Sequence, residues 1–244
     1  MEVEAWGPGT AWLLEAAPEL IGESDDPGAF RPEHPLLRDL MRRLPGLRLG
    51  RSRAVFEAIV PAILEQKITG LEAGRVRRRL VQQYGEPAPG PAEVATGLFV
   101  PPTPERLAGL PYYAFHPLGL EQRRALTIIR IAGRAPALEA LLTAPPEVAR
   151  ARLEALPGVG PWTAAEAVRT AFGDPDAVSI GDFHMPNLVC WALAGEPRGD
   201  DRRMLELLEP YAGHRGRVQR LLEASGMSAP RRGPHMAARA IERI

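Results

Sequence analysis

The sequence has almost no lysine and almost no cysteine. Lys67 is the single lysine among 30 basic residues, so the other basic side chains are arginines, which cannot form a Schiff base. Cys190 is the single cysteine, which excludes an internal disulfide, a four-cysteine zinc site and a four-cysteine iron–sulfur cluster. We also expect no other metal site and no other cofactor.

Net charge and long apolar runs are lacking as well. The 30 basic residues balance 30 acidic ones, so a contact with nucleic acid must come from a local basic face. No apolar run has the length of a membrane span, and the first residues lack the positive and apolar regions of a secretory signal. These features predict a cytoplasmic protein without a membrane partner, and we expect it to be a monomer.

Apolar residues recur at helical spacing along the 244 residues, and no convincing set of alternating strands is found. The pattern predicts an all-α fold, with an ordered loop over residues 86–103. The expected helices cover residues 34–44, 52–64, 69–84, 120–132, 147–156, 161–172, 182–194, 201–208, 217–224 and 234–243.

Local signals fix two of the expected helix starts. Ser52 is expected to cap one helix, within which Pro61 should produce a kink or a break. Thr69 and Glu72 have the spacing of a capping box, which predicts the start of the next helix. Arginines on the outer faces of two helices are expected to be solvated. They are Arg75, Arg77, Arg78 and Arg79 in the first case and Arg123, Arg124 and Arg130 in the second.

The segment 153–165 predicts two helices joined by a tight turn. Pro157 ends the first helix because its ring clashes with the preceding turn and its nitrogen carries no hydrogen. Gly158 and Gly160 allow backbone angles that other residues rarely adopt, and Pro161 suits the first position of the second helix. Free N–H groups at the positive end of a helix dipole suit a phosphate, although an ordinary helix connection is the alternative for a bare Gly-x-Gly.

The flanks of this turn favour DNA binding. The string L-P-G-V-G-P-W-T-A-A, residues 156–165, resembles the hairpin of the helix-hairpin-helix (HhH-GPD) DNA glycosylases. In that superfamily a catalytic aspartate begins the next helix but one, and Asp182 in S-I-G-D-F-H holds that place. Asp182 could instead serve only as a helix N-cap, and both roles are compatible because capping fixes the carboxylate.

Residues 27–226 resemble the 3-methyladenine DNA glycosylase II branch of this superfamily. The extra N-terminal β-rich domain of longer members is not expected here. The segments that carry the resemblance are H-P-L (34–36) through P-G-L-R (45–48), F-E-A-I (56–59), I-L-E-Q-K-I-T (63–69) and Y-G-E (84–86).

The resemblance implies roles for individual residues. Asp182 would be catalytic. The base pocket would draw on Trp162, Phe183, Glu166, Tyr112 and Tyr113. The DNA backbone would be held by Pro157, Gly158, Val159, Gly160, Thr163, Gln66 and Lys67, and a monovalent cation could bind the hairpin carbonyl groups. Burial in the core is the alternative for Tyr112, Tyr113 and His116, and packing beneath the hairpin is the alternative for Trp162.

The chain departs from the branch at several of these positions. Gly181 and Phe183 flank Asp182 where an acidic residue and a tyrosine are common, and Glu166 replaces a pocket tyrosine. Lys67 stands where an apolar side chain fills the gap left by the flipped base. These differences leave the preferred lesion open.

Two helical lobes with a cleft between them are implied, one from residues 1–68 with 175–244 and one from 69–174. The implied function is a monofunctional DNA glycosylase that flips out and hydrolyses alkylated or related bases in double-stranded DNA, and that associates with the nucleoid when bound. Trp162 occupies the position of the Schiff-base lysine, so no lyase activity is expected. A non-catalytic DNA-binding module and a helical scaffold for protein partners are the alternatives.

Overall fold

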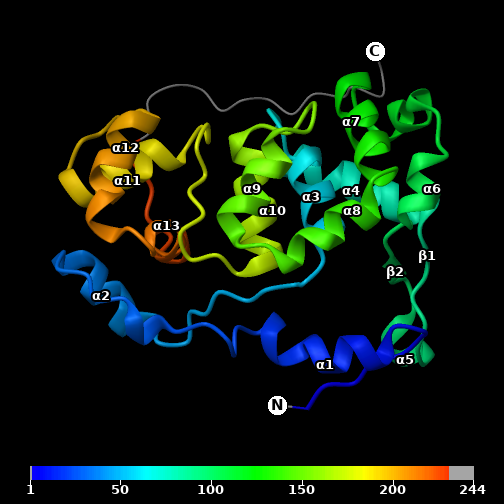
Figure 1. Cartoon of the computed structure of the whole chain (residues 1–244), viewed down its shortest axis with the longest axis horizontal. Helices are drawn as coiled ribbons and strands as arrows, with labels where there is room; N and C mark the ends of the chain where they lie inside the picture. Colours follow the sequence, from blue (N-terminus) through cyan, green and yellow to red (C-terminus); the bar gives the residue numbers. More distant parts are fainter. Residues whose placement is uncertain (1, 231–244) are drawn as a thin grey trace. The chain divides into compact units, whose positions relative to one another are not determined.

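The computed structural model describes residues 2–230, and these form helices and one pair of two-residue strands (Figure 1). The expected all-α fold class is confirmed. By their internal packing, the described residues divide into two units. The first unit comprises residues 2–17 and 53–159, and the second comprises residues 18–52 and 160–230.

Helix α1 (Thr10–Leu20) begins in the first unit and ends in the second. The first unit also contains α3 (Val55–Leu64), α4 (Gly70–Tyr84), β1 (Glu86–Pro87), α5 (Ala92–Ala95), β2 (Phe99–Val100), α6 (Pro104–Ala108), η2 (Tyr112–Leu118), α7 (Gln122–Ala132), α8 (Ala135–Glu139), η3 (Ala140–Thr143) and α9 (Pro146–Glu154). The second unit contains η1 (Pro27–Ala29), α2 (Pro35–Arg43), α10 (Pro161–Phe172), α11 (Met185–Ala194), α12 (Asp201–Leu208), η4 (Glu209–Tyr211) and α13 (Arg215–Ala224).

The helices expected between residues 34 and 224 are all present, and their ends shift by three residues or fewer. The capping box of Thr69 and Glu72 is confirmed at the start of α4. The helix expected at 234–243 lies outside the described residues. Helix α1 was not expected, and the loop expected at 86–103 holds α5 between two antiparallel strands.

The start of α3 differs from its prediction. Ser52 does not cap this helix, whose N-cap position is Ala54. The carboxylate of Glu139, at the end of α8, accepts hydrogen bonds from the N–H groups of Val55 at 3.0 Å and Phe56 at 2.8 Å. A carboxylate suits the positive end of a helix dipole, so a distant residue supplies the cap. The helix also continues through Pro61 to its end at Leu64.

Arg124 was expected to be solvated on α7, and this prediction is wrong. Its side chain is 2% exposed, and its Nη1 donates a 2.6 Å hydrogen bond to the carbonyl oxygen of Leu64 at the end of α3. Glu121 lies 3.3 Å from its Nε. A buried arginine on the last carbonyl of a helix satisfies a group that the helix itself leaves unpaired. Arg124 thereby fixes the point where α3 leads into Gln66 and Lys67.

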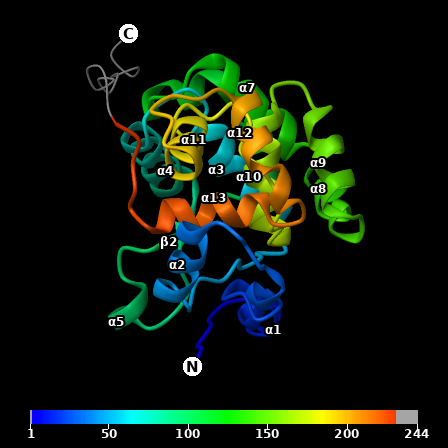
Figure 2. The same cartoon turned by 90° about the vertical axis from the view of Figure 1, so that its left-hand side faces the viewer.

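The core of the second unit is built from α2, α11, α12 and α13, which lie together in Figure 1 and in the perpendicular view of Figure 2. Its buried apolar residues include Leu37, Leu40, Val189, Met204, Leu208, Val218 and Leu222. Arg217 of α13 forms a bidentate ion pair with Asp25, and both side chains are almost fully buried. This pair connects α13 to a segment 192 residues earlier in the chain.

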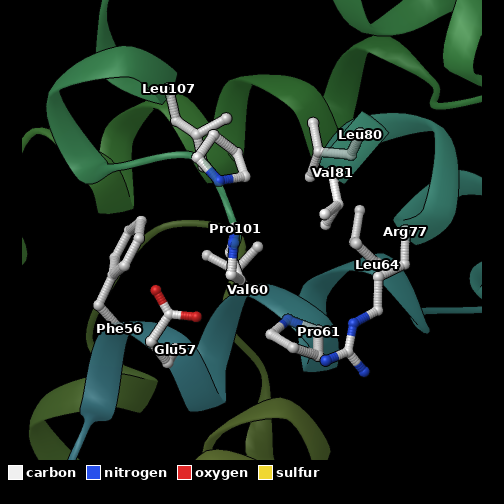
Figure 3. Close-up of a pocket in the computed structure, with 11 residues that line it drawn as sticks. Phe56, Glu57, Val60, Pro61, Leu64, Arg77, Leu80, Val81, Pro101 and Leu107 are labelled. Atoms are coloured by element: carbon white, nitrogen blue, oxygen red, sulfur yellow. The ribbon is translucent and has the colours of Figure 1, made fainter. Parts of the chain in front are cut away.

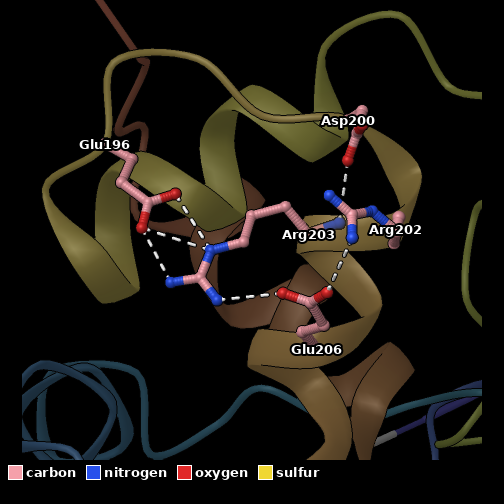
Figure 4. A network of polar contacts seen from close by, with 5 residues as sticks. All are labelled: Glu196, Asp200, Arg202, Arg203 and Glu206. Atoms are coloured by element: carbon pink, nitrogen blue, oxygen red, sulfur yellow. Dashed lines mark hydrogen bonds and ion pairs between the residues drawn. The ribbon is translucent and has the colours of Figure 1, made fainter.

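A polar network connects the loop after α11 to α12 (Figure 4). Arg203 donates from Nη2 to Glu196 at 2.7 Å and from Nη1 to Glu206 at 3.1 Å, while its own backbone N–H donates to Asp200. The hydrogen bonds from Arg203 lower the pKa of Glu196 below its ordinary value. The network orients α12, whose first residue contacts the loop that holds Asp182.

The bounds of the two units differ from those of the expected lobes. Residues 53–68 fall in the first unit because α3 packs against α4, α7 and α8. Residues 160–174 fall in the second unit, where the N–H of Ser52 donates to the carbonyl oxygen of Thr170 at 2.9 Å. The division into two lobes at 1–68 with 175–244 and at 69–174 stays a prediction.

Candidate functional site

The hairpin after α9 depends on Gly158. This residue has a φ of +93°, a left-handed conformation that side chains with a Cβ rarely adopt. A Cβ at this position would lie 2.9 Å from the Cγ2 of Thr127 on α7 and closer still to its Oγ1. Gly160 differs, because its φ is −102° and a Cβ there would have no atom within 4 Å. Packing therefore requires a glycine at the first position and leaves open space at the second.

Two side chains of the first unit hold the carbonyl groups of this turn. The Nε2 of Gln66 donates to the carbonyl oxygen of Gly158 at 3.0 Å, and the Nη1 of Arg130 donates to that of Pro157 at 2.8 Å. Arg130 places a positive charge at this oxygen, which disfavours a cation there. A monovalent cation elsewhere on the hairpin stays a prediction.

The amide groups of the turn are differently placed. The N–H of Val159 donates to the carbonyl oxygen of Leu156 at 3.0 Å, which closes the turn. For the N–H groups of Gly158 and Gly160, the described part of the chain offers no hydrogen-bond acceptor. With carbonyl oxygens engaged and these amides available, the turn is suited to an anion such as a phosphate oxygen.

Lys67 follows Gln66 directly and is exposed. Its φ of +56° is in the left-handed region, which is uncommon for a residue with a side chain. The hydrogen bond of Gln66 to Gly158 thus places this strained loop beside the hairpin, within one unit. Arg130 and Thr127, which complete this arrangement, were missed because their partners lie about 30 residues away and no local pattern marks them.

Asp182 is held by three N–H donors within the second unit. Its Oδ1 accepts from the backbone N–H groups of His184 and Met185, both at 2.7 Å, at the start of α11. Its Oδ2 accepts from the indole Nε1 of Trp162, the second residue of α10, at 3.1 Å. The carboxylate is part-buried and acceptor-only when ionised, so the donors fit its anionic form. The sequence predicted both residues, and the structure brings them into direct contact.

The groups around Asp182 fix its loop. Gly181 has a φ of +87°, and its N–H donates to both carboxylate oxygens of Asp201, the first residue of α12, at 3.0 and 3.1 Å. Phe183 is 84% exposed and stands edge-to-face against His184. The loop therefore presents an exposed aromatic ring next to a restrained carboxylate.

Glu166, one turn after Trp162, is engaged by its neighbours. Its carboxylate accepts a 2.6 Å hydrogen bond from the hydroxyl group of Ser179 and pairs with Arg169 on the same helix. The Glu166 side chain is 16% exposed, and Thr163 is buried. Trp162 is part-buried, as Glu166 is.

Tyr112, Tyr113 and His116 lie on η2 of the first unit and are all exposed. The alternative of burial in the core is thus wrong for these three. The predicted site residues form three groups: one around the hairpin with Gln66 and Lys67, one around Asp182 with Trp162, and the pair Tyr112 and Tyr113 on η2.

An apolar hollow in the first unit contains none of the predicted site residues (Figure 3). The carboxyl group of Glu57 lies between Phe56 and Val60, and Leu107 and Arg77 also line the hollow. Burial raises the pKa of Glu57, as does the neighbouring Glu139, while Arg77 acts in the opposite direction.

Neither metal coordination nor a membrane span is found in the described range. Among residues 2–230, no group of three or more His, Cys, Asp or Glu side chains is placed to hold a metal ion. In the same range, every helix is too short or too polar to cross a membrane.

The chain is similar in sequence to known DNA repair proteins. No family model matches the chain. The chain is 36% identical over 172 residues to DNA-3-methyladenine glycosylase 2 of Escherichia coli K12, a match covering 70% of this chain and 58% of the relative. It is 34% identical over 171 residues to the probable bifunctional transcriptional activator/DNA repair enzyme AlkA of Mycobacterium tuberculosis H37Rv, covering 70% of this chain and 32% of that protein. The chain thus spans 58% of the length of the first relative and 32% of the length of the second.

Solved structures show the same fold. The 3-methyladenine DNA glycosylase of Archaeoglobus fulgidus has a TM-score of 0.72 and 24% identity, and the likeness covers 91% of this chain and 76% of that one. The 3-methyladenine DNA glycosylase Mag1 of Schizosaccharomyces pombe, in complex with abasic DNA, has a TM-score of 0.63 and 16% identity over 89% of this chain and all of the other.

Proposed function

We propose that the chain is a member of the helix-hairpin-helix superfamily of DNA glycosylases and a monofunctional DNA glycosylase of base excision repair, a proposal that its likeness to 3-methyladenine glycosylases supports. Its substrate is double-stranded DNA that contains an alkylated, 3-methyladenine-like or related damaged base. The observation that carries the proposal is the contact between Trp162 and Asp182. It joins the aromatic ring and the carboxylate that this reaction requires.

The reaction breaks the bond between the base and C1′ of its sugar after the nucleotide has been flipped out of the duplex. The base leaves with the bonding electrons, and positive charge develops on the sugar. An anionic Asp182 opposes that charge, and one of its oxygens can orient the water that attacks C1′. The amides of His184 and Met185 hold this carboxylate in place before the substrate arrives.

Trp162 has two functions in this proposal. Its indole N–H fixes Oδ2 of Asp182, and its flat ring offers a face to an electron-poor, cationic base. The hairpin at Gly158 and Gly160 supports binding of the DNA backbone, because its free amides suit phosphate oxygens. Lys67 replaces an apolar gap-filling residue with an amine.

Single-turnover release of the base from alkylated duplex tests the proposal. Asp182→Asn keeps the shape but removes the charge and sets an NH2 group against Trp162 or the helix amides. We expect a loss of about 100- to 1000-fold, the range for removal of one electrostatic stabiliser. Trp162→Phe, which keeps a ring and removes the N–H donor, should be less severe. Near wild-type release by Asp182→Asn would favour the non-catalytic DNA-binding module.

We also propose that the protein lacks lyase activity. Strand cleavage by β-elimination needs an amine that attacks the sugar carbon and forms an imine. Lys67 is the single lysine, and Trp162 occupies the position from which an amine would act. We expect an intact abasic strand, cut only after heat or alkali, and little trapping by borohydride. Efficient trapping that disappears in Lys67→Ala would make Lys67 the nucleophile.

The remaining parts of the proposal concern the setting of the reaction. The protein would act as a cytoplasmic monomer, associated with the nucleoid while it is bound to DNA. It would use no iron–sulfur cluster or other cofactor, since hydrolysis needs only a carboxylate, a base pocket and water.

A further inference from the structure

A row of exposed aromatic rings lies on η2 in the first unit. Tyr112 is 44% exposed and Tyr113 is 66% exposed, and His116 is also exposed. The two tyrosine rings stand edge-to-face, with centroids 5.9 Å apart and an angle of 75° between their planes. This arrangement leaves aromatic surface open to solvent, where a flat ligand can stack on it.

The segment that carries these rings is anchored to α4. The hydroxyl group of Tyr84 donates to the carbonyl oxygen of Ala114 at 3.2 Å, and the Nη1 of Arg79 donates to that of Leu118 at 3.3 Å. The guanidinium group of Arg106 lies over the Tyr84 ring at 5.6 Å. The exposed rings are therefore presented by a rigid support.

Helix α4, which packs against η2, carries positive charge along its exposed side. Arg75 lies one turn before Arg79 on the same side of the helix, and Arg78 is next to that stripe. Both Arg75 and Arg78 are exposed, and neither has an ion-pair partner among residues 2–230. Glu72, the acid of this helix, is buried in its capping box. The surface thus combines unneutralised cations with open aromatic faces.

We propose that this surface binds unpaired, single-stranded DNA. Bases would stack on Tyr112 and Tyr113, and phosphates would contact Arg75 and Arg78. Open ring faces favour an unpaired strand over duplex, because bases inside a duplex already stack on each other. An acidic protein would match the arginines but gives no reason for the exposed rings. The binding goes beyond base excision and does not require it.

Helix α4 connects the segment that contacts the hairpin to the region of η2. Gln66 contacts the hairpin, Lys67 follows, and α4 then runs 15 residues toward η2. At about 1.5 Å per residue, the helix spans about 22 Å, roughly six nucleotide steps at 3.4 Å. A strand that contacts both the hairpin and the tyrosines would therefore extend over several nucleotides.

Fluorescence anisotropy with an undamaged 12-nucleotide oligothymidine strand tests the inference, with a blunt 12-base-pair duplex as reference. The Tyr112→Ala/Tyr113→Ala double variant should bind the single strand at least tenfold more weakly, since each stacked base contributes a factor of about five or more. The Tyr112→Phe/Tyr113→Phe variant should bind within about twofold of wild type. Arg75→Ala/Arg78→Ala should lower the salt slope by about 1.4, at 0.7 per phosphate contact.

Arg202→Ala is the control for loss of charge, because Arg202 is 84% exposed on α12 of the second unit. It should leave the binding of oligothymidine unchanged. Equal weakening of single strand and duplex by the alanine variants, or preferential binding of polyglutamate, would overturn the inference. A wild-type protein that releases alkylated bases but ignores oligothymidine refutes this inference alone. One that binds oligothymidine through the tyrosines but releases no base refutes the glycosylase alone.

Discussion

Replacing Gly158 by alanine should destabilise the protein much more than the same change at Gly160. At Gly158 the new Cβ would meet Thr127, and the backbone would hold an alanine at a φ of +93°. The left-handed conformation costs about 1–2 kcal/mol and the overpacking about 1–3 kcal/mol. Together they lower the free energy of unfolding by about 2–5 kcal/mol. For a chain of this size, that is a fall in melting temperature of roughly 5–20 °C.

Gly160 serves as the matched control within the same turn. A Cβ there meets nothing within 4 Å and the backbone angle is ordinary, so Gly160→Ala should change the melting temperature by a degree or two. If a phosphate approaches this turn, Gly160→Val should still weaken DNA binding while the fold remains intact. Stability and DNA binding are thereby separated.

A double variant measures the steric part alone. Thr127→Ala removes the Oγ1 and Cγ2 atoms, so in Gly158→Ala/Thr127→Ala the strain of the backbone remains and most of the overpacking is relieved. Thermal unfolding followed by circular dichroism is the assay, with about 1–3 kcal/mol recovered in the double variant. Equal melting temperatures for Gly158→Ala and Gly160→Ala would refute the reasoning.

Two further predictions concern titration and the buried ion pair. Glu57 has a raised pKa in the folded state, so its ionisation opposes folding. Glu57→Gln should raise the free energy of unfolding at pH 7, with a gain that shrinks as the pH falls toward 4.5 in urea titrations; a gain that is constant with pH would contradict this. Burial favours a raised pKa for Asp25, but hydrogen bonds from Arg217 and from the N–H of Leu49 lower the pKa below 3.8 in the folded state. The Asp25 carboxylate therefore stabilises the fold above pH 3.8, and this stabilisation is lost as the pH falls through the folded pKa. Arg217→Met should cost about 3–5 kcal/mol at pH 7 and progressively less in acid, whereas Arg220→Met, in an exposed pair, should cost less than about 1 kcal/mol.

Local signals in the sequence were sufficient for much of the fold. The capping box at Thr69 involves residues three apart, and the glycines and prolines of the hairpin act on their own backbone. Such features can be predicted from a short stretch of sequence, because the interacting residues lie only a few positions apart. The Trp162 and Asp182 positions came from a resemblance, and the hydrogen bond between them became visible only in the structure.

The errors share a different cause. Arg124 looked solvated because its neighbours on α7 are charged, yet its acceptor at Leu64 is 60 residues away. Ser52 looked like a cap because it precedes an apolar run, yet Glu139 supplies the carboxylate from 83 and 84 residues further on. Tertiary contacts override local preference at such positions, and a single sequence does not reveal the partner.

The interleaving of the two units has a consequence for synthesis of the chain. Residues 53–159 are contiguous, so this part of the first unit can begin to pack as soon as it has left the ribosome. The second unit must wait, because α2 finds its partner α13 only after about 170 more residues have been made. Until then Leu37 and Leu40 lack part of the core that buries them in the folded chain. A chain whose synthesis ends before Arg215 would therefore lack α13 and could not complete the core of the second unit.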